Sequence, residues 1–404
     1  MPFLGVVVTS LLASLLLQHT RSVPHASGIE NRPARIVSKL GSEYELERSL
    51  PANGTCIYTL LDHRYLVAMH PDGTEIWRYD TADNDCHACC VTDTGEPYIA
   101  CHGGWLYSLE TSGKLRWKRN VFSAAELAYK QGNGSSEDAP SISAPLCDAH
   151  GNVFMLLRRR VVCYTPEGKL KYTCDLGDPP GVDFMENTVV GFQVARKGTV
   201  FVATDEASRP EGDGLRIIAP DGKLRTKAPL VGRCHADPDK EVVIDEHQPG
   251  TWTAYDYSWR KLWELEVDSQ FVDFDGQGTI YALTQQGAVV AVSEATGKLV
   301  WSTWLRGDEL LAGGDHPLYV LQRADSKVVA LDPSTGKPLW QTGPGDEERA
   351  GALKAQEEQY GLNYAEITDP QLRPAFFLTY VYADSNGDVY FEGTGQWLFA
   401  ADGR

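Results

Sequence analysis

The stretch that decides the fold is Ala330–Trp340, which reads ALDPSTGKPLW. An apolar strand leads into Asp, Pro and Gly, and a second strand leaves this turn toward a tryptophan. Gly336 can adopt the positive φ angle that a tight turn needs, so the stretch predicts a β-hairpin. A close copy, AVSEATGKLVW, stands at Ala291–Trp301. The hairpin is therefore a repeat.

Weaker copies of this hairpin run along most of the chain. Their turns lie at Gly73, Gly113, Gly168, Gly222, near Trp259 in a degenerate copy, and at Gly297, Gly336 and Gly403. A second hairpin signal, such as Lys197–Phe201, precedes most of them. Two hairpins per unit make a four-stranded antiparallel sheet, and turns about 37 to 67 residues apart have the spacing of propeller blades. We expect an all-β, single β-propeller of eight four-stranded blades, or seven if the copy around Tyr255 is not a full unit.

The chain ends predict how the ring closes. The last unit stops at Gly403 and Arg404 without an outer strand, which would leave an unprotected edge. Tyr44–Ser49 has the character of the outer strand Glu75–Tyr79. We therefore expect Tyr44–Ser49 to complete the final sheet, so that N- and C-terminal strands pair.

Composition narrows the class of function. The 404 residues are 42% hydrophobic and 23% charged, as in globular proteins, and 38 Gly with 22 Pro favour turns and strands. Lys and Arg number 37 against 55 Asp and Glu, which gives a net charge of −18. This is the wrong sign for neutralising phosphates, so general nucleic-acid binding is excluded.

The N-terminus predicts export. Met1–Leu17 is an uncharged apolar run followed by a polar stretch, so we expect a signal peptide at residues 1–22, with an uncleaved anchor or a chance run as alternatives. Residues 23–42 would be extended and residues 43–404 the propeller, with no membrane span after cleavage. The protein would be secreted, periplasmic if bacterial, or held in the secretory-pathway lumen. Asn53 and Asn133 begin N-glycosylation acceptor triplets.

Two stretches depart from the repeat. Residues 123–145 read as a Gly-, Ser- and Pro-rich loop, and residues 343–376 contain a predicted exposed acidic helix at Asp346–Gln359. Loops on rigid scaffolds carry function, so either insertion is a candidate lid or partner contact. The alternative is a tolerated surface excursion.

The pattern Ala-x-Asp-x-x-Thr-Gly-Lys-x-x-Trp at Ala330–Trp340 resembles the repeat of quinoprotein-like, or pyrroloquinoline-quinone repeat, β-propellers. The resemblance covers roughly residues 43–404. In that family the closing tryptophan docks between blades, which implies a structural docking role here for Trp77, Trp117, Trp263, Trp301 and Trp340. The family contains quinone-dependent dehydrogenases of alcohols and sugars, and also scaffolds that bind no quinone, such as outer-membrane assembly lipoproteins. Neither subfamily is matched closely.

The most unusual local sequence is DCHACC at Asp85–Cys90. In the quinone-dependent dehydrogenases an adjacent cysteine pair forms a ring against the cofactor, so the resemblance makes Cys89 and Cys90 candidate cofactor contacts. A zinc site of Cys86, Cys89, Cys101 and His102 is another interpretation. Ordinary disulfides within or between the first blades are the favoured one, since export permits oxidation. Because the nine cysteines are an odd number, at least one thiol should stay unpaired or pair outside the chain.

Other chemistry is not indicated. The turn near Glu167 offsets Cys174 from the residue opposite Cys163 by three or four positions, which is too far for a disulfide. No H-E-x-x-H, G-x-S-x-G or P-loop motif occurs. We expect a non-enzymatic, monomeric scaffold with no cofactor, no metal and no catalytic residue, whose loops on one face bind a protein or polysaccharide partner. The alternative is a quinone-dependent dehydrogenase of alcohols or sugars, with pyrroloquinoline quinone and calcium in the central funnel.

Overall fold

The computed structural model describes most of residues 29–402. It leaves out residues 33, 40–45, 53–55, 71, 131, 133–141, 158–159, 177–188, 205–214, 229–232, 238–239, 249, 313–315, 324, 361–377, 384–387 and 394–396. The predicted signal peptide and both glycosylation triplets, at Asn53 and Asn133, therefore lie outside the described residues. No helix among the described residues is long and apolar enough to cross a membrane.

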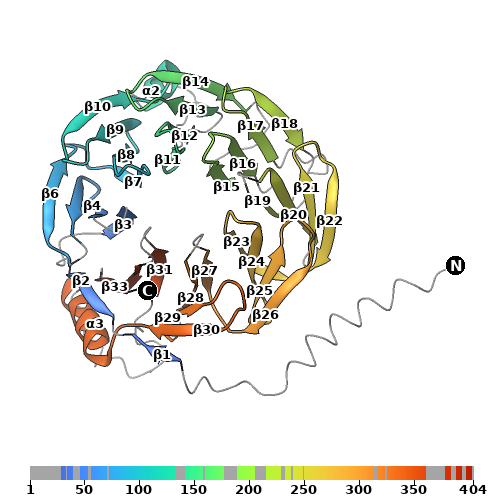
Figure 1. Ribbon diagram of the computed structural model, residues 1–404. Helices are drawn as coiled ribbons and strands as arrows, with labels where there is room; N and C mark the ends of the chain where they lie inside the picture. Colours follow the sequence, from blue (N-terminus) through green and yellow to red (C-terminus); the bar gives the residue numbers. More distant parts are fainter. Residues whose placement is uncertain are drawn as a thin grey trace.

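The described strands form eight sheets, which Figure 1 shows arranged radially around a common axis. The first sheet holds β3 (Leu46–Ala52), β4 (Cys56–Leu61), β5 (Tyr65–Met69) and β6 (Glu75–Asp80). The second holds β7 (Cys86–Val91), β8 (Pro97–Cys101), β9 (Trp105–Leu109) and β10 (Leu115–Asn120). The third holds β11 (Leu146–Cys147), β12 (Val153–Leu157), β13 (Arg160–Tyr164) and β14 (Leu170–Asp175).

The middle of the chain repeats this order. The fourth sheet holds β15 (Val189–Val194), β16 (Val200–Thr204), β17 (Leu215–Ile218) and β18 (Leu224–Ala228). The fifth holds β19 (Arg233–Asp237), β20 (Val242–Gln248), β21 (Thr251–Asp256) and β22 (Lys261–Glu266). The sixth holds β23 (Ser269–Phe274), β24 (Thr279–Thr284), β25 (Ala288–Ser293) and β26 (Leu299–Trp304).

The last two sheets include strands from the N-terminal part of the chain. The seventh holds β27 (Glu309–Leu311), β28 (Leu318–Gln322), β29 (Lys327–Leu331) and β30 (Pro338–Thr342), with β1 (Glu30–Asn31) added in parallel outside β30. The eighth holds β31 (Leu378–Ala383), β32 (Val389–Gly393), β33 (Trp397–Ala401) and β2 (Arg35–Lys39). Two helices, α2 (Ala124–Lys130) and α3 (Asp346–Tyr360), complete the described elements.

Burial follows each strand's position in its sheet. Central strands such as β8 and β12 are buried along their whole length, because neighbouring sheets cover both of their faces. Outer strands such as β26 alternate between exposed and half-buried positions, because only one face meets another sheet. The apolar clusters lie between sheets: Tyr98 of the second sheet, for example, shares a cluster with Met155 of the third.

The turns have the predicted chemistry. The turn glycines Gly113, Gly168 and Gly336 all have positive φ angles. In the degenerate copy Trp259 takes this place with a φ of 59°, and its N–H donates to the Asp256 carbonyl as a turn glycine's would. A bulky residue in this region of φ/ψ space is strained, so the hairpin is held by the surrounding sheet.

The prediction of which N-terminal strand pairs with β33 was wrong. Most of Tyr44–Ser49 falls in β3, which pairs with β4 as the innermost strand of the first sheet. The strand that pairs with β33 is β2, which precedes β3 in the chain, with Arg35 opposite Ala400 and Lys39 opposite Trp397. The prediction failed because strand propensity alone does not distinguish an inner strand from an outer one.

A segment before β2 also crosses the seventh sheet. The N–H of Arg32 donates to the Gln341 carbonyl at 2.9 Å, and the Thr342 hydroxyl donates to the Arg32 carbonyl at 2.8 Å. The Arg32 guanidinium lies 4.8 Å from the Trp340 ring centroid and donates to the Asp402 carbonyl at 2.9 Å. Arg32 therefore links the seventh sheet to the end of the chain.

Candidate partner-binding face

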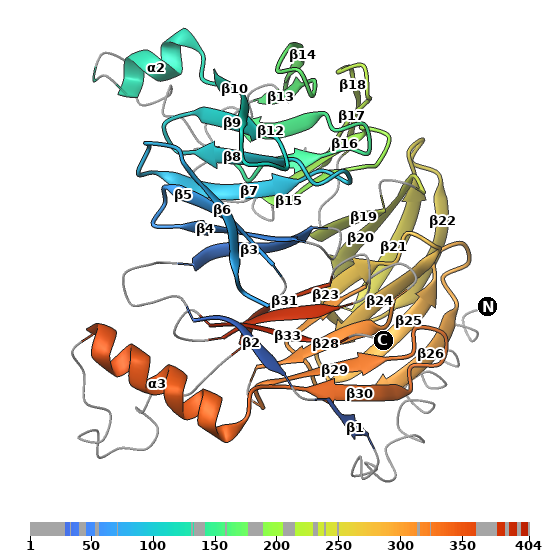
Figure 2. The same cartoon turned by 60° about the vertical axis from the view of Figure 1, so that its left-hand side comes forward.

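Both described helices lie on the same side of the ring. Each follows the outer strand of one sheet and precedes the inner strand of the next: α2 stands between β10 and β11, and α3 between β30 and β31. In a four-stranded antiparallel sheet these connections leave from one end, opposite the β3–β4-type and β5–β6-type turns. Figure 2 shows α2 and α3 projecting from the same side, away from the β13–β14 and β17–β18 turns. We call this side the helix face.

The sequence encodes the start of α2 in a motif that the prediction of a loop at 123–145 missed. The N–H of Ser123 donates to Glu126 Oε2 at 2.6 Å, and the N–H of Glu126 lies 3.3 Å from Ser123 Oγ. This is a capping box, Ser-x-x-Glu, which satisfies donors at a helix start. The signal was present in Ser123–Glu126, although the helix is only 7 residues long.

Polar contacts fix α2 to the second and third sheets. Glu126 is buried despite its charge, and its carboxylate pairs with Arg160 at the start of β13. Arg160 also donates to the Val121 carbonyl at 3.1 Å. At the other end of the helix, Lys130 Nζ donates to the His102 carbonyl in the second sheet. A paired buried carboxylate of this kind holds α2 in one position against the third sheet.

The helix α3 confirms the predicted helix and extends it by one residue to Tyr360. Its first turn carries Asp346, Glu347 and Glu348, which suits the positive end of the helix dipole. Asp346 and Glu347 are exposed, while Leu353 packs against the cluster between the seventh and eighth sheets. The acidic N-terminal end of α3 is therefore exposed to solvent, while the packing of Leu353 anchors the helix to the sheets.

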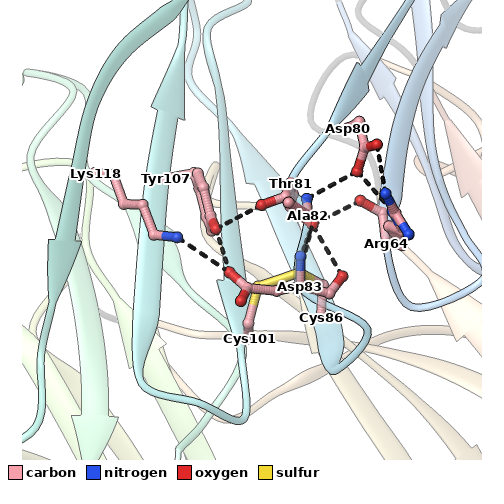
Figure 3. A network of polar contacts seen from close by, with 9 residues as sticks. All are labelled: Arg64, Asp80, Thr81, Ala82, Asp83, Cys86, Cys101, Tyr107 and Lys118. Atoms are coloured by element: carbon pink, nitrogen blue, oxygen red, sulfur yellow. Dashed lines mark hydrogen bonds and ion pairs between the residues drawn. A yellow bond between two sulfur atoms is a disulfide. The ribbon is translucent and has the colours of Figure 1, made fainter.

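A polar network joins the first two sheets on the helix face (Figure 3). Arg64, in the β4–β5 turn, makes two 2.7 Å hydrogen bonds to the Asp80 carboxylate. The bidentate geometry lowers the pKa of Asp80 below its ordinary value. The Thr81 hydroxyl donates to the Arg64 carbonyl at 2.7 Å. The β6–β7 connection is thus fastened to its own sheet.

The same connection is fastened to the second sheet. The Tyr107 hydroxyl donates to the Thr81 carbonyl at 2.9 Å and contacts the Asp83 carboxylate. Burial, followed by the Asp83 charge, raises the pKa of Tyr107, so this phenol stays protonated. Lys118 Nζ lies 3.2 Å from Asp83 Oδ2 and 4.1 Å from the Trp105 ring centroid. All these groups have partners in the protein, so the network holds the β6–β7 connection in place.

The structure pairs two of the cysteines that the sequence offered as zinc ligands. Cys86 and Cys101, which are opposite each other in β7 and β8, form a disulfide. One disulfide within the first blades is therefore present, as the favoured interpretation expected. Asp85 lies within 4.8 Å of both sulfurs, but the disulfide occupies two of the predicted zinc ligands. The remaining two do not join it: Cys89 is buried in the core, and the His102 ring stacks on His87 at 4.1 Å.

Cys89 and Cys90 are not bonded to each other. They are successive residues of one strand, so their side chains point to opposite faces. Cys89 packs into the cluster with the first sheet, and Cys90 packs against the cluster with the third sheet. Their arrangement does not fit the adjacent-cysteine ring of the quinone-dependent dehydrogenases.

Cys163 and Cys174 are also unbonded, as expected. Cys163 is paired with Tyr172 and Cys174 with Val161, so the offset is two residues. The prediction of three or four was too large because the strand contains a register shift between Cys163 and Tyr164.

The tryptophans predicted to dock between blades make contacts to the following sheet. The indole N–H groups donate to backbone carbonyls at 2.6 to 2.8 Å in four cases, Trp77 to Thr111, Trp117 to Pro166, Trp263 to Glu294 and Trp301 to Pro333. Each ring lies against the turn glycine of that sheet. Trp340 instead lies beneath Arg32 and packs against the eighth sheet. In the third sheet Tyr172 takes the tryptophan's place against Gly222.

Comparisons with known proteins agree with this architecture. A family model described as outer membrane protein assembly factor BamB matches residues 250–366. No curated protein sequence matches the chain. The crystal structure of BamB from Moraxella catarrhalis has a TM-score of 0.54 at 12% identity, covering 91% of this chain and 99% of that one.

Two further solved structures are similar. The computationally designed Ika8 protein has a TM-score of 0.57 at 12% identity, covering 93% of this chain and all of the design. Quinohemoprotein alcohol dehydrogenase from Comamonas testosteroni has a TM-score of 0.54 at 13% identity, covering 92% and 77%. Identities this low show the fold alone. The Ala330–Trp340 repeat lies inside the residues that the family model matches, which supports the predicted resemblance to pyrroloquinoline-quinone repeat β-propellers.

Proposed function

We propose that this chain is an exported, eight-bladed β-propeller that acts as a non-enzymatic binding or assembly scaffold, and that its helix face holds the partner. The observation that carries the proposal is that α2 and α3, the described helices of the two insertions, project from one side of the ring. Propellers bind partners through loops that rigid sheets hold in place. The solved BamB, named as an assembly factor by the family model, has the same fold.

Contacts between sheets support eight blades in a closed ring. Innermost strands contact each other from sheet to sheet, including β3 with β7, β27 with β31, and β31 with β3. The pairing of β2 with β33 joins the two ends of the chain in the eighth sheet. In a closed ring every sheet packs between two neighbours, so the loops are held on a rigid scaffold.

The chemistry of the helix face favours a protein partner over a polysaccharide. The exposed acidic end of α3 and the net charge of −18 would attract a basic protein segment and would orient it during encounter. Sugar sites commonly use several exposed aromatic rings, whereas the described large apolar side chains include a single exposed ring, Trp304 at the end of β26.

The test compares two pairs of charge-neutralising substitutions. Partners that co-purify with the mature chain are identified, and their affinity is then measured for the variant Asp346→Asn/Glu347→Gln. The control is Glu110→Gln/Glu167→Gln, which removes the same charge from turns on the opposite side. We expect weaker binding and a smaller salt dependence only for the first variant. Equal effects of both variants would contradict a role for the helix face.

The dehydrogenase alternative rests on the likeness to quinohemoprotein alcohol dehydrogenase. The divergence of Cys89 and Cys90 does not support it. Titration of the purified protein with calcium and pyrroloquinoline quinone, assayed with an electron-accepting dye, tests it directly. Turnover of an alcohol or sugar would replace the scaffold proposal.

A further inference from the structure

Two cysteines from neighbouring sheets lie close together near the inner end of the ring. Cys90 is on β7 of the second sheet and Cys147 on β11 of the third, 57 residues later. Their sulfurs are 3.0 Å apart, and neither belongs to a disulfide. A disulfide bond is about 2.05 Å long, so a shift of about 1 Å would close the pair.

The surrounding contacts hold the two sulfurs in this relation. Cys90 is opposite Tyr98 in the second sheet, and the Tyr98 hydroxyl donates to the Gly151 carbonyl of the third sheet at 2.9 Å. Cys147 is opposite Val153, two residues beyond Gly151. The Tyr98 hydrogen bond between the two sheets therefore lies beside the sulfurs and helps to hold the two strands together.

We propose that Cys90 and Cys147 form a second disulfide, a covalent staple between the second and third sheets. The oxidant is a small-molecule or protein disulfide, such as glutathione disulfide. One protein thiolate attacks it, giving a mixed disulfide and releasing one thiol. The other protein thiolate then attacks the protein sulfur and releases the second thiol, so two protein thiols and one disulfide become one protein disulfide and two thiols.

Three other described cysteines are less suited to oxidation. Cys163 is fully buried, and burial raises its pKa to about 12, which suppresses the reactive thiolate. Burial also raises the pKa of Cys56 and Cys174. Cys90 and Cys147 are both half-buried, so an oxidant can reach them.

The position of the staple connects it to the helix face. Leu127 of α2 and Ile142, which follows that helix in the chain, pack against the same cluster as Cys90 and Cys147. Closing the disulfide would fix the two sheets from which this insertion emerges. Reduction would leave the packing and the Tyr98 hydrogen bond as the contacts there.

Counting thiols tests the proposal sharply. The full chain is equilibrated with glutathione disulfide, unfolded, and reacted with a thiol reagent. Nine cysteines less the Cys86–Cys101 pair and the staple leave five thiols, if the other cysteines stay reduced. Cys90→Ser and Cys147→Ser should each show one thiol more than wild type, because each frees its partner. Cys56→Ser, a half-buried control, should show one fewer.

Peptide mapping without reduction identifies the partners. We expect a peptide that joins Cys90 to Cys147, together with one that joins Cys86 to Cys101. Alkylation of both Cys90 and Cys147 in protein whose Cys86–Cys101 bond is intact would overturn the proposal, as would a bond from Cys90 to any other cysteine. Cys90→Ala serves as the second variant if Cys90→Ser does not fold, judged by circular dichroism.

Discussion

The contact between Trp77 and Gly113 gives a prediction that separates backbone strain from docking. A Cβ at Gly113 would lie 2.6 Å from the Trp77 ring, and Gly113 has a φ of 82°. At Gly132 the φ is 77° and a Cβ would meet nothing within 4 Å. Alanine at either position pays the left-handed backbone cost of about 1–2 kcal/mol. Only Gly113→Ala must also displace the indole.

That displacement has its own cost. Moving the Trp77 ring loses the 2.8 Å hydrogen bond to the Thr111 carbonyl, worth about 1 kcal/mol, and disturbs its packing on Tyr58, worth about 0.5–1.5 kcal/mol. We expect Gly132→Ala to lower the free energy of unfolding by about 1–2 kcal/mol and Gly113→Ala by about 3–4 kcal/mol.

The assay is urea denaturation followed by circular dichroism, with Trp77→Ala added to make a double-mutant cycle. In the Trp77→Ala background the cost of Gly113→Ala should fall to that of Gly132→Ala. Equal costs for the two glycine variants in the wild-type background would refute the docking argument.

Three further predictions concern single side chains. Trp301→Phe should lower the free energy of unfolding by about 1 kcal/mol, because it removes the indole hydrogen bond to the next sheet. Trp304 is 53% exposed, so Trp304→Phe should change the free energy of unfolding little. Burial raises the pKa of Glu294 from 4.5 to about 7, so its neutral form stabilises the fold fully below about pH 4.5, and this contribution is lost as the pH rises to about 7. Glu294→Gln should remove about 1–3 kcal/mol of that pH dependence in denaturation titrations, and identical profiles would contradict burial of the acid. Arg32→Ala should lower the free energy of unfolding by about 1–2 kcal/mol, because it removes the contact with the Trp340 ring and the hydrogen bond to the Asp402 carbonyl. The thermal midpoint of unfolding should therefore fall. An unchanged midpoint would show that this segment contributes no stability.

The repeat could be recognised in the sequence because each of its residues meets one physical requirement of the fold. Glycine at 336 permits the positive φ, and tryptophan at 301 fills the space above that glycine in the next sheet. Even the degenerate turn at Trp259 was recognisable, since Ala254, Asp256 and the closing Trp263 of the repeat are still present. Local chemistry therefore predicted the sheets.

What sequence reasoning missed depends on contacts between distant residues. β2 and β3 have similar strand character, and only packing decides which is outermost. The approach of Cys90 to Cys147 depends on how the second and third sheets sit together, so the spacing of the cysteines could not show it. The capping box at Ser123 was a local signal, and the surrounding Gly, Ser and Pro residues obscured it.

The pairing of β2 with β33 has a consequence for biosynthesis. A ribosome makes β2 long before β33, so β2 must wait for its partner until all the sheets between them in the sequence have been synthesised. In that interval the outer positions of the eighth sheet cannot assemble. A nascent chain would expose these unfilled edges until β33 is made, so the loss of this one short strand would be far more damaging than its length implies.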